Sequence, residues 1–322
     1  MYAIRLHEFG GPEQLSYEQV PDPMPGHGQL RIAVRAAGVR GADLAFRAGT
    51  LDCPAAEFPL VPGQEVAGVV DALGAGVPPW LLGRRVVTHL GLATGGYAEL
   101  VIREAAAVHP IPQGLSSAAA VAMIETGRSA LSALNAAALS ATDVVAVTAA
   151  AGALGSMLVR GARASGAKVI AIVDGPVKPS AIRGLGASFV LEHTAADWPA
   201  ELSGAVTAVL DSAGGEQGAR AFDLLAPGGR FVMCGAGPEG PAELSTRAVF
   251  ARGLTVCTVP CSGTGIRTAE ARALATAVTG GLVPAVQSFP LSAAAEAHDA
   301  LATRASFGKV VLRPSVPAGQ FE

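Results

Sequence analysis

The hydrophobic positions change their spacing along the chain, with a transition near residue 118. Before it, short apolar runs with alternating polar residues are separated by Gly and Pro, as in the turn cluster PDPMPGHG at 21–28. This pattern is typical of short strands that form a barrel-like domain. The strands we expect here cover residues 2–6, 15–20, 29–37, 61–70, 85–88 and 97–102.

After the transition the pattern becomes alanine-rich and helical, and Ser116 or Ser117 is the expected N-cap of the first helix. From residue 143 onward, apolar β-branched runs alternate with helical spacing, as a parallel sheet with crossover helices requires. A further helix is expected after Gly265, and the tail 289–314 predicts a turn, a helix and a strand. The strands expected in this part cover residues 144–147, 168–173, 189–191, 205–211, 229–234 and 254–259.

The most specific motif is a small-residue turn at 149–155, between the buried strand 144–147 and a helix. A pyrophosphate binds against the first backbone N–H groups of a helix, where the helix dipole is positive. Gly152 permits this close approach and Gly155 lets the helix pack on the strand, although Ala150 replaces the usual first glycine. We expect a dinucleotide-binding βαβ unit; the alternative is a glycine-rich turn of another α/β unit. The predicted phosphate-binding residues are Ala151, Gly152, Ala153, Leu154 and Gly155.

Length and charge narrow the class of protein. The chain has 322 residues, which suggests two domains. A net charge of −3 without any block of like charges argues against nucleic-acid binding. The apolar stretches are too short to span a membrane, and the N-terminus lacks the apolar core of a signal peptide. The four cysteines form no CxxC pair, so we expect free thiols and a cytoplasmic protein.

Several segments together resemble one enzyme family. The chain is similar over nearly its whole length to the medium-chain dehydrogenases/reductases, in their zinc-independent quinone oxidoreductase (zeta-crystallin-like) branch. The resemblance implies an α/β protein with a Rossmann domain, built on a doubly wound parallel sheet, and a GroES-like β-barrel catalytic domain. The motifs that carry it are AAGVRGADLAFRAG at 36–49, PLVPGQEVAGVVDALGAGV at 59–77, GGYAELV at 95–101, AAAGALG at 149–155, LDSAGG at 210–215, LAPGGRFVMCG at 225–235 and FPLSAAAEAHDAL with GKVVLRP within 289–314.

The same resemblance implies how the chain divides into domains. Residues 1–118 form the GroES-like catalytic domain, which the C-terminal segment completes, and residues 119–260 form the Rossmann NAD(P)-binding domain. Residues 261–322 supply a helix and the return to the catalytic domain. Family members often form homodimers by joining the edge strands of their Rossmann sheets, and the strand at 254–259 is the expected edge.

The resemblance also indicates that the protein binds no metal. Zinc-dependent relatives carry a cysteine at the position of Arg40 and a histidine at the position of Gln64 in PGQEVAG. Catalytic zinc needs three protein ligands, and an arginine that stays protonated cannot be one of them. We therefore predict no metal site and interpret Glu65, in the same motif, as a structural carboxylate between the domains.

The residues after the second Rossmann strand give two opposing indications about the cofactor. An acidic residue there accepts a hydrogen bond from the ribose 2′-OH of NAD, whereas a cation favours the 2′-phosphate of NADP. Asp174 lies one place past the acidic position of NAD-using relatives, and the resemblance places Lys178 on the family's 2′-phosphate lysine. We favour NADPH, with NADH as the alternative. The other interpretation of Asp174 is a solvated loop carboxylate.

Four more residues are cofactor-binding candidates by resemblance. Ser129 matches a family Thr or Ser near the nicotinamide, while Ser212 in DSAGG and Gly235 in VMCGAG are expected on the nicotinamide side. Lys309 in GKVVL either reaches the cofactor or is a surface lysine. Tyr97 is interpreted as a core residue rather than a proton donor.

Without a metal, catalysis depends on hydrogen-bond donors. A hydride from nicotinamide C4 leaves negative charge on the oxygen of a quinone or a conjugated enone, and one donor to that oxygen can contribute about 2.7–4 kcal/mol. A buried charge must be paired, so Arg40 or Arg128 either pairs with Glu125 or contacts the substrate. The candidate catalytic residues are Arg40, Asp43, Glu125 and Arg128.

These observations predict an NADPH-dependent oxidoreductase that transfers a hydride to a quinone or to the C=C bond of an enone. Its expected partners are a small-molecule substrate and a second copy of the chain, with no nucleic acid and no membrane. The high Ala and Gly content would suit a GC-rich bacterial genome and a role in polyketide tailoring. Two alternatives remain: an enzyme that catalyses elimination or cyclisation without net redox, and a protein that binds NADPH with little turnover.

Overall fold

The computed structural model shows a chain divided between two compact units. The first unit comprises Met1–Glu125, Val286–Thr303 and Lys309–Glu322, and the second comprises Thr126–Ala285 and Arg304–Gly308. The structure describes residues 1–51, 57–91, 94–175, 179–195, 198, 200–237, 239–259, 263–279, 282 and 285–315.

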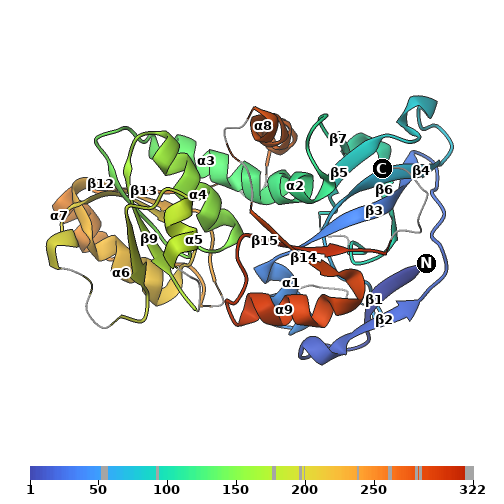
Figure 1. Cartoon of the computed structure of the whole chain (residues 1–322), viewed down its shortest axis with the longest axis horizontal. Coiled ribbons are helices and arrows are strands. Elements are labelled where there is room, and N and C mark those ends of the chain that lie inside the picture. The colour runs from blue at the N-terminus through green and yellow to red at the C-terminus, as the bar shows by residue number, and fades with distance from the viewer. Residues whose placement is uncertain are drawn as a thin grey trace. The chain divides into compact units, whose positions relative to one another are not determined.

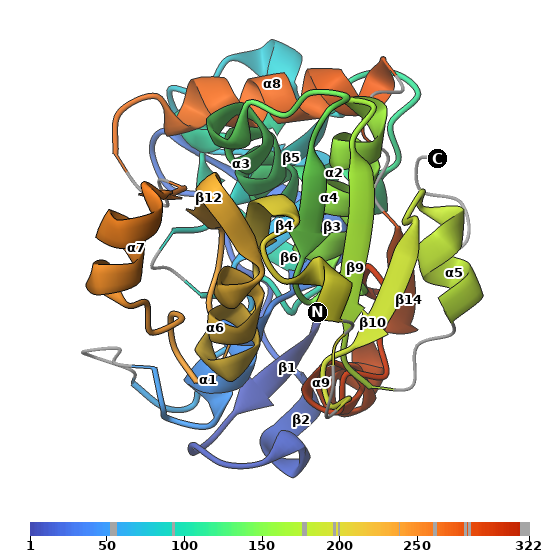
Figure 2. The same ribbon diagram turned by 90° about the vertical axis from the view of Figure 1, so that its left-hand side faces the viewer.

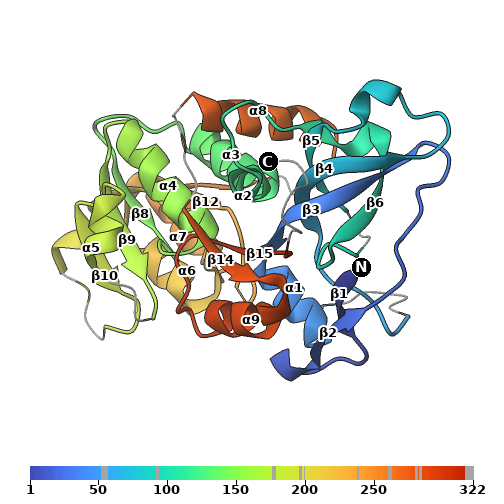
Figure 3. The ribbon, with the colours of Figure 1, turned by 45° about the vertical axis from the view of Figure 1, so that its right-hand side comes forward.

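The first unit is built on a sheet with the strand order β14-β15-β3-β4-β5-β7, and β6 pairs with β3. Its neighbouring strands are antiparallel except for β14 and β15, and all of its members except β7 are labelled in Figure 3. A separate antiparallel pair is formed by β1 and β2. The bounds are β1 (Tyr2–Leu6), β2 (Leu15–Gln19), β3 (Gln29–Val39), β4 (Glu65–Leu73), β5 (Arg85–His89), β6 (Leu100–Glu104), β7 (His109–Pro110), β14 (Val286–Pro290) and β15 (Lys309–Arg313).

Alternating burial along the strands places the core of the first unit. In β3, Leu30, Ile32 and Val34 are buried between less buried neighbours, as period-two side chains on one sheet face should be. Helix α2 packs on β3 and β4, and α9 packs on β15. The bounds are α1 (Gly41–Arg47), α2 (Ser117–Ala122) and α9 (Ala294–Ala302), with short turns η1 (Pro12–Gln14), η2 (Pro79–Leu81), η3 (Ala105–Ala107) and η6 (Leu291–Ala293).

The second unit is built on a parallel sheet with the strand order β10-β9-β8-β11-β12-β13 (Figures 1 and 2). From β8 the chain adds β9 and β10 on one side, and then β11, β12 and β13 on the other side. This is the arrangement of a doubly wound dinucleotide-binding sheet. The bounds are β8 (Val144–Val147), β9 (Lys168–Val173), β10 (Phe189–Glu192), β11 (Val206–Asp211), β12 (Leu225–Met233) and β13 (Thr255–Thr258).

Helices cover this parallel sheet and fill its crossovers. Helix α4 packs on β8 and β9 and also on α3, while α6 packs on β11 and β12. A π-helical turn, η4 (Met123–Gly127), lies between α2 and α3. The helix bounds are α3 (Arg128–Ala137), α4 (Ala153–Ala164), α5 (Pro179–Gly184), α6 (Gly215–Asp223), α7 (Thr246–Arg252) and α8 (Ile266–Val278), with a short turn η5 (Ala200–Leu202).

The predicted α/β fold class is confirmed, and the differences from the predicted strands have local causes. The strands predicted at 144–147 and 168–173 match β8 and β9 to the residue. The strand expected at 97–102 begins only at Leu100, because Tyr97 turns into the core with no exposed surface. The same ring affects the strand predicted at 61–70, which begins only at Glu65 as β4. A Cβ on Gly63 would lie 2.2 Å from the Tyr97 ring, so the chain before β4 bends around that ring.

The two compact units do not divide at residues 118 and 260, where we predicted the domain boundaries. Compact units and domains are defined differently, so these boundaries remain predictions. The first unit runs to Glu125 and therefore includes α2, whereas α8 belongs to the second unit. Within the second unit β13 is the edge strand expected at 254–259, and dimerisation through it stays a prediction. In the part of the chain that the structure describes, no helix has the length and hydropathy needed to cross a membrane.

A directional hydrogen-bond chain links α1 to α9 inside the first unit. Arg47 Nη1 lies 3.4 Å from Nδ1 of His298, whose Nε2 lies 3.1 Å from the Tyr97 hydroxyl. That hydroxyl donates to Asp43 over 3.4 Å. Because a guanidinium only donates, Nδ1 is the acceptor and Nε2 carries the proton toward Tyr97. Burial, together with the charge of Arg47, lowers the pKa of His298 to about 3.

We expect His298 to make the protein less stable in acid. Its pKa is lowered from 6.5, so its contribution to stability is complete above pH 6.5 and is lost as the pH falls toward about 3. Each pH unit in this window costs up to about 1.4 kcal/mol. Urea unfolding across this range should give a shallower pH slope for His298→Gln than for the wild type, and an unchanged slope for the exposed His27→Gln. Equal slopes for the wild type and His298→Gln would contradict the assignment.

Candidate functional site

The turn between β8 and α4 has the geometry that the sequence predicted for a phosphate-binding turn. The Ala150 N–H donates to the carbonyl of Ile172 over 2.9 Å, and the Gly152 N–H donates to the carbonyl of Ala149 over 2.9 Å. Ala149 has a φ of +44°, which turns the chain sharply out of the strand. Gly152 then caps the twelve-residue helix α4 in extended geometry.

The residues of this turn fit a diphosphate. A Cβ on Gly155 would lie 2.2 Å from the carbonyl oxygen of Ala149, so only glycine lets α4 pack this closely against the turn. A Cβ on Gly152 would meet its nearest atom at 3.3 Å, and Gly152, Ala153 and Leu154 are half-exposed. The first N–H groups of a helix have no acceptor within the helix and attract an anion. Gly155 therefore has the packing role that the sequence predicted, and the phosphate-binding role of Gly152 stays a prediction.

A second loop of the same unit is held against this turn by Asp211. Its buried carboxylate accepts from the Thr148 hydroxyl over 2.6 Å and from the Gly214 N–H over 3.1 Å. The Ser212 hydroxyl donates to the Thr148 carbonyl over 2.8 Å, so this side chain holds the loop in place. A Cβ on Gly235 would lie 3.3 Å from the Ser212 carbonyl, which shows that these two predicted cofactor residues are neighbours.

Asp174, directly after β9, is partly buried and paired. One carboxylate oxygen accepts from the Gln217 amide over 3.0 Å, and the other binds the guanidinium of Arg304. Its side chain is only 9% exposed, so the interpretation as a solvated loop carboxylate is wrong. Lys178, the other predicted determinant of the cofactor, lies outside the described residues.

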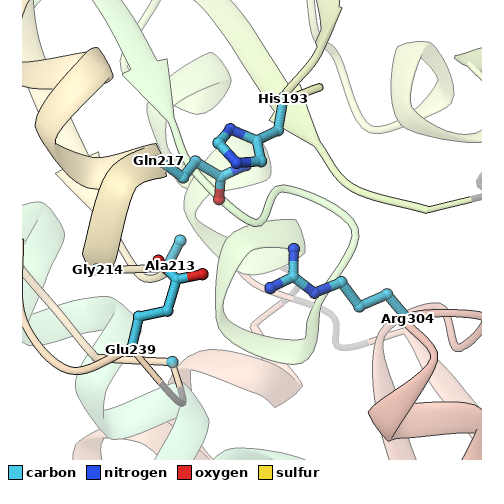
Figure 4. Close-up of a pocket in the computed structure, with 7 residues that line it drawn as sticks. His193, Ala213, Gly214, Gln217, Glu239 and Arg304 are labelled. Atoms are coloured by element: carbon cyan, nitrogen blue, oxygen red, sulfur yellow. The ribbon is translucent and has the colours of Figure 1, made fainter. Parts of the chain in front are cut away.

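A small pocket lies beside this ion pair. Its volume is about 20 Å³, which holds about one water molecule. Figure 4 shows the Arg304 guanidinium extending into the pocket. The lining residues are His193, Ala213, Gly214, Gln217, Gly237, Glu239 and Arg304.

His193 and Arg304 were not among the residues predicted from the sequence. His193 follows β10 directly, and the carboxyl ends of parallel strands are where ligands of such sheets bind, so its position was a usable signal. Arg304 lies far along the chain, has a φ of +57° and reaches Asp174 only through the fold.

The first unit contains a separate cluster of charged side chains around Arg40. Arg40 Nη1 donates to Glu125 over 2.9 Å and lies 3.1 Å from Nε2 of His89, while Nη2 donates to the side-chain oxygen of Gln64. The Arg40 side chain is 14% exposed and Glu125 is 29% exposed, so solvent reaches the cluster. His89 was not singled out from the sequence and comes from the end of β5.

The charges of this cluster perturb one another. Burial alone would raise the pKa of Glu125, but the charges of Arg40 and Lys309 outweigh it and lower this pKa to about 2. Glu65 is fully buried, and burial raises its pKa to about 7 against the opposing charge of Lys309. Burial alone would lower the pKa of Arg40, but the carboxylates of Glu65, Asp43 and Glu125 raise this pKa above its usual value. Arg40 is therefore always a cation.

Several predicted residues of the cluster have structural contacts. Asp43 is buried and accepts from the Arg40 backbone N–H over 2.9 Å, which caps the start of α1. Lys309 Nζ donates to Glu65 over 2.5 Å with both side chains buried, so the surface-lysine interpretation is wrong. Glu65 is thus a structural carboxylate, and its partner lies in the same unit. Tyr97 is a core residue, as expected.

Arg40 forms the pair with Glu125 that one of the two interpretations required. A contact between Arg40 and substrate stays a prediction. The structure does not bring all four catalytic candidates into one unit, because Arg128 belongs to the second unit, at the start of α3. Arg128 is buried, and Ser129 beside it is half-exposed.

The residues at the expected zinc position do not fit a metal. The Arg40 guanidinium binds Gln64 there, and a guanidinium cannot donate a lone pair to zinc. Within the described ranges, no three His, Cys, Asp or Glu side chains are grouped as a metal site requires. The prediction that the protein works without zinc therefore rests on the chemistry of Arg40 and Gln64.

Comparisons with known proteins agree with this geometry. The alcohol dehydrogenase GroES-like domain matches residues 26–113, and the zinc-binding dehydrogenase domain matches residues 185–312. The chain is 30% identical to a quinone oxidoreductase of Pseudomonas aeruginosa, covering 97% of this chain and 99% of the relative. It is also 30% identical to a 2-haloacrylate reductase of a Burkholderia species, covering 97% and 98%.

A solved structure of the Escherichia coli quinone oxidoreductase complexed with NADPH superposes with a TM-score of 0.84 at 25% identity, covering 98% of this chain and 100% of that one. A GroES-like domain and a Rossmann-type parallel sheet with this glycine turn define an oxidoreductase that uses a nicotinamide cofactor. The chain belongs to the medium-chain dehydrogenase/reductase superfamily, in its quinone oxidoreductase branch.

Gly155→Ala should destabilise the protein, because the new Cβ would be forced to 2.2 Å from the Ala149 carbonyl oxygen. Overpacking of this kind costs about 1–3 kcal/mol. Denaturant unfolding would measure the change. Gly184→Ala in α5 is the control, since nothing lies within 4 Å of a Cβ there. A Gly155→Ala variant as stable as the control would contradict the packing argument.

Proposed function

We propose that the protein is an NADPH-dependent reductase that transfers a hydride to a quinone or to the C=C bond of an enone, without a metal. The observation that carries the proposal is the half-exposed N-terminus of α4 at Gly152, bare of side chains where a nucleotide diphosphate binds. The residues proposed to bind the cofactor belong to the second unit.

Two relatives support the choice of substrate. One is a quinone oxidoreductase and the other a 2-haloacrylate reductase, and both named substrates are conjugated acceptors. Hydride addition to such an acceptor moves an electron pair onto oxygen, where cationic donors stabilise it. Arg40 provides a permanent cation of this kind. The polyketide-tailoring role remains a prediction from composition alone.

The residues around Asp174 support NADPH as the cofactor. Arg304 and His193 lie where the strands β9 and β10 end, and a cation there favours a 2′-phosphate over a 2′-hydroxyl. The E. coli quinone oxidoreductase was solved with NADPH. When bound, the nicotinamide nucleotide supplies the hydride, and this chain's residues bind and orient it. The Asp174 carboxylate opposes the phosphate and holds Arg304.

The direct test is NADPH absorbance with a panel of quinones, enones and 2-haloacrylates. We expect NADPH oxidation with at least one acceptor class, at a rate that EDTA does not change, and no stoichiometric zinc by elemental analysis. Product without NADPH oxidation would instead indicate elimination or cyclisation. Tight NADPH binding with no product would indicate a binding protein, and faster oxidation of NADH would overturn the cofactor assignment.

Asp174→Asn should tighten NADPH binding about fivefold relative to NADH. The change frees Arg304 and removes a negative charge. An exposed ion pair contributes up to about 1 kcal/mol, and a difference of about 1.4 kcal/mol changes a dissociation constant about tenfold. Fluorescence titration with each nucleotide gives the two dissociation constants. Asp223→Asn removes a charge from an exposed site in the same unit and should leave their ratio unchanged. A shift toward NADH in Asp174→Asn would reverse our assignment of Asp174.

A further inference from the structure

Gln217 of α6 is a buried amide with a partner on each of two segments. Its side-chain oxygen accepts from the Ala149 backbone N–H over 3.2 Å, and its Nε2 donates to the Asp174 carboxylate over 3.0 Å. A backbone N–H only donates and an ionised carboxylate only accepts, so these two partners determine the orientation of the amide. Gln217 thereby connects the predicted phosphate-binding turn to the residue that follows β9.

The first contact holds the turn after β8 in an uncommon shape. Ala149 has a φ of +44°, a left-handed conformation that is unfavourable for residues other than glycine. Its carbonyl accepts from the Gly152 N–H over 2.9 Å, and its own N–H is held by Gln217. Both polar groups of this backbone unit are therefore engaged, and the turn keeps the shape that the predicted diphosphate site needs.

The second contact occupies the Asp174 carboxylate. Gln217 binds one oxygen and the Arg304 guanidinium binds the other, and the Asp174 side chain is only 9% exposed. Gln217 and Arg304 also line the same small pocket, as Figure 4 shows. The ribose 2′-hydroxyl of NADH would have to compete with both donors for Asp174. The amide of Gln217 therefore disfavours the nucleotide that has no 2′-phosphate.

Helix α6 holds the ends of two neighbouring strands through one of its faces. Arg220 lies three residues after Gln217 and thus on the same face of the helix. Its guanidinium donates to the His193 carbonyl over 2.6 Å and to the Ala195 carbonyl over 3.1 Å, and lies 4.3 Å from the centre of the Trp198 ring. The amide at Gln217 is therefore placed by an element that also fixes the segment after β10.

We propose that Gln217 is a positioning residue for the choice of nucleotide: its amide keeps Asp174 paired and unavailable to a ribose 2′-hydroxyl, so that the nucleotide with a 2′-phosphate is favoured. The inference rests on the proposed function and adds a determinant to the same site. Gln217 acts through Asp174 and Ala149 and is not a catalytic residue.

The test measures NADPH and NADH dissociation constants by titrating the full-length protein and following the fluorescence of the reduced nicotinamide. Gln217→Met has a similar volume and loses both hydrogen bonds. Loss of the contact to Ala149 should weaken both nucleotides about fivefold, and loss of the contact to Asp174 should lower the preference for NADPH over NADH by about fivefold, since each hydrogen bond makes a modest net contribution.

Gln217→Glu separates the two contacts, because it keeps an acceptor for the Ala149 N–H and places a second carboxylate beside Asp174. At about pH 9 this added negative charge should lower the NADPH preference at least about tenfold. Toward about pH 5 the two carboxylates share a proton and a donor is restored, so the preference should recover. His193 and Glu239, the other titratable groups of the pocket besides Arg304, are present in the wild type as well, so the difference between the two pH profiles reports the new carboxylate.

Gln19→Glu is the matched control, because it adds the same charge at an exposed glutamine of β2 in the first unit. It should keep the wild-type preference at every pH. If Gln217→Met fails to fold, the isosteric Gln217→Glu and its pH series still decide. A nucleotide preference of Gln217→Glu that matches the wild type at every pH would refute the inference, and so would a lowered melting temperature with an unchanged preference per folded molecule.

These binding measurements need no electron acceptor, which separates the inference from the proposed function. A wild type that binds NADPH but reduces no quinone or enone would refute the proposed reductase activity and leave the role of Gln217 standing on its pH profile. A wild type that binds neither nucleotide, or that binds NADH more tightly, would refute both the cofactor assignment and the role of Gln217.

Discussion

The buried ion pair between Glu65 and Lys309 is the constraint on which the first unit depends. The two residues are 244 positions apart, lie 2.5 Å from each other and are almost completely buried. A buried charge without its partner costs several kcal/mol, so these charges must meet for the unit to fold. They join β4 to β15, and the chain between them contains the whole second unit.

This pair also sets the electrostatics of the Arg40 cluster. Lys309 neutralises Glu65, and its charge helps to hold the pKa of Glu125 low, so Arg40 has an ionised partner. Arg40 in turn is the local positive charge of the cluster. A metal would impose its own coordination geometry, whereas a guanidinium needs acceptors placed in its plane, which Glu125 and Gln64 supply.

In the second unit, packing at Gly155 and the buried carboxylate of Asp211 organise the proposed nucleotide site. The first brings α4 onto the turn after β8, and the second ties the loop after β11 to Thr148. Both contacts lie at the carboxyl ends of β8 and β11, the neighbouring strands at which the strand order of the sheet changes direction. Asp174 follows β9 and binds the guanidinium of Arg304, and the effect of this pair on the choice of nucleotide is a proposal.

The sequence by itself determined the fold class, the bounds of β8 and β9 and the packing role of Gly155. These depend on short-range patterns: a buried β-branched run, a turn that excludes side chains and a helix that follows at once. It left open whether Arg40 or Arg128 pairs with Glu125 or contacts the substrate, and the structure pairs Arg40 with Glu125. Only the tertiary structure decided that Asp174 binds Arg304, that Lys309 is buried against Glu65 and that His89 faces Arg40. Each of these contacts joins residues at least 49 positions apart, and no local pattern records which distant side chain a packed core brings alongside.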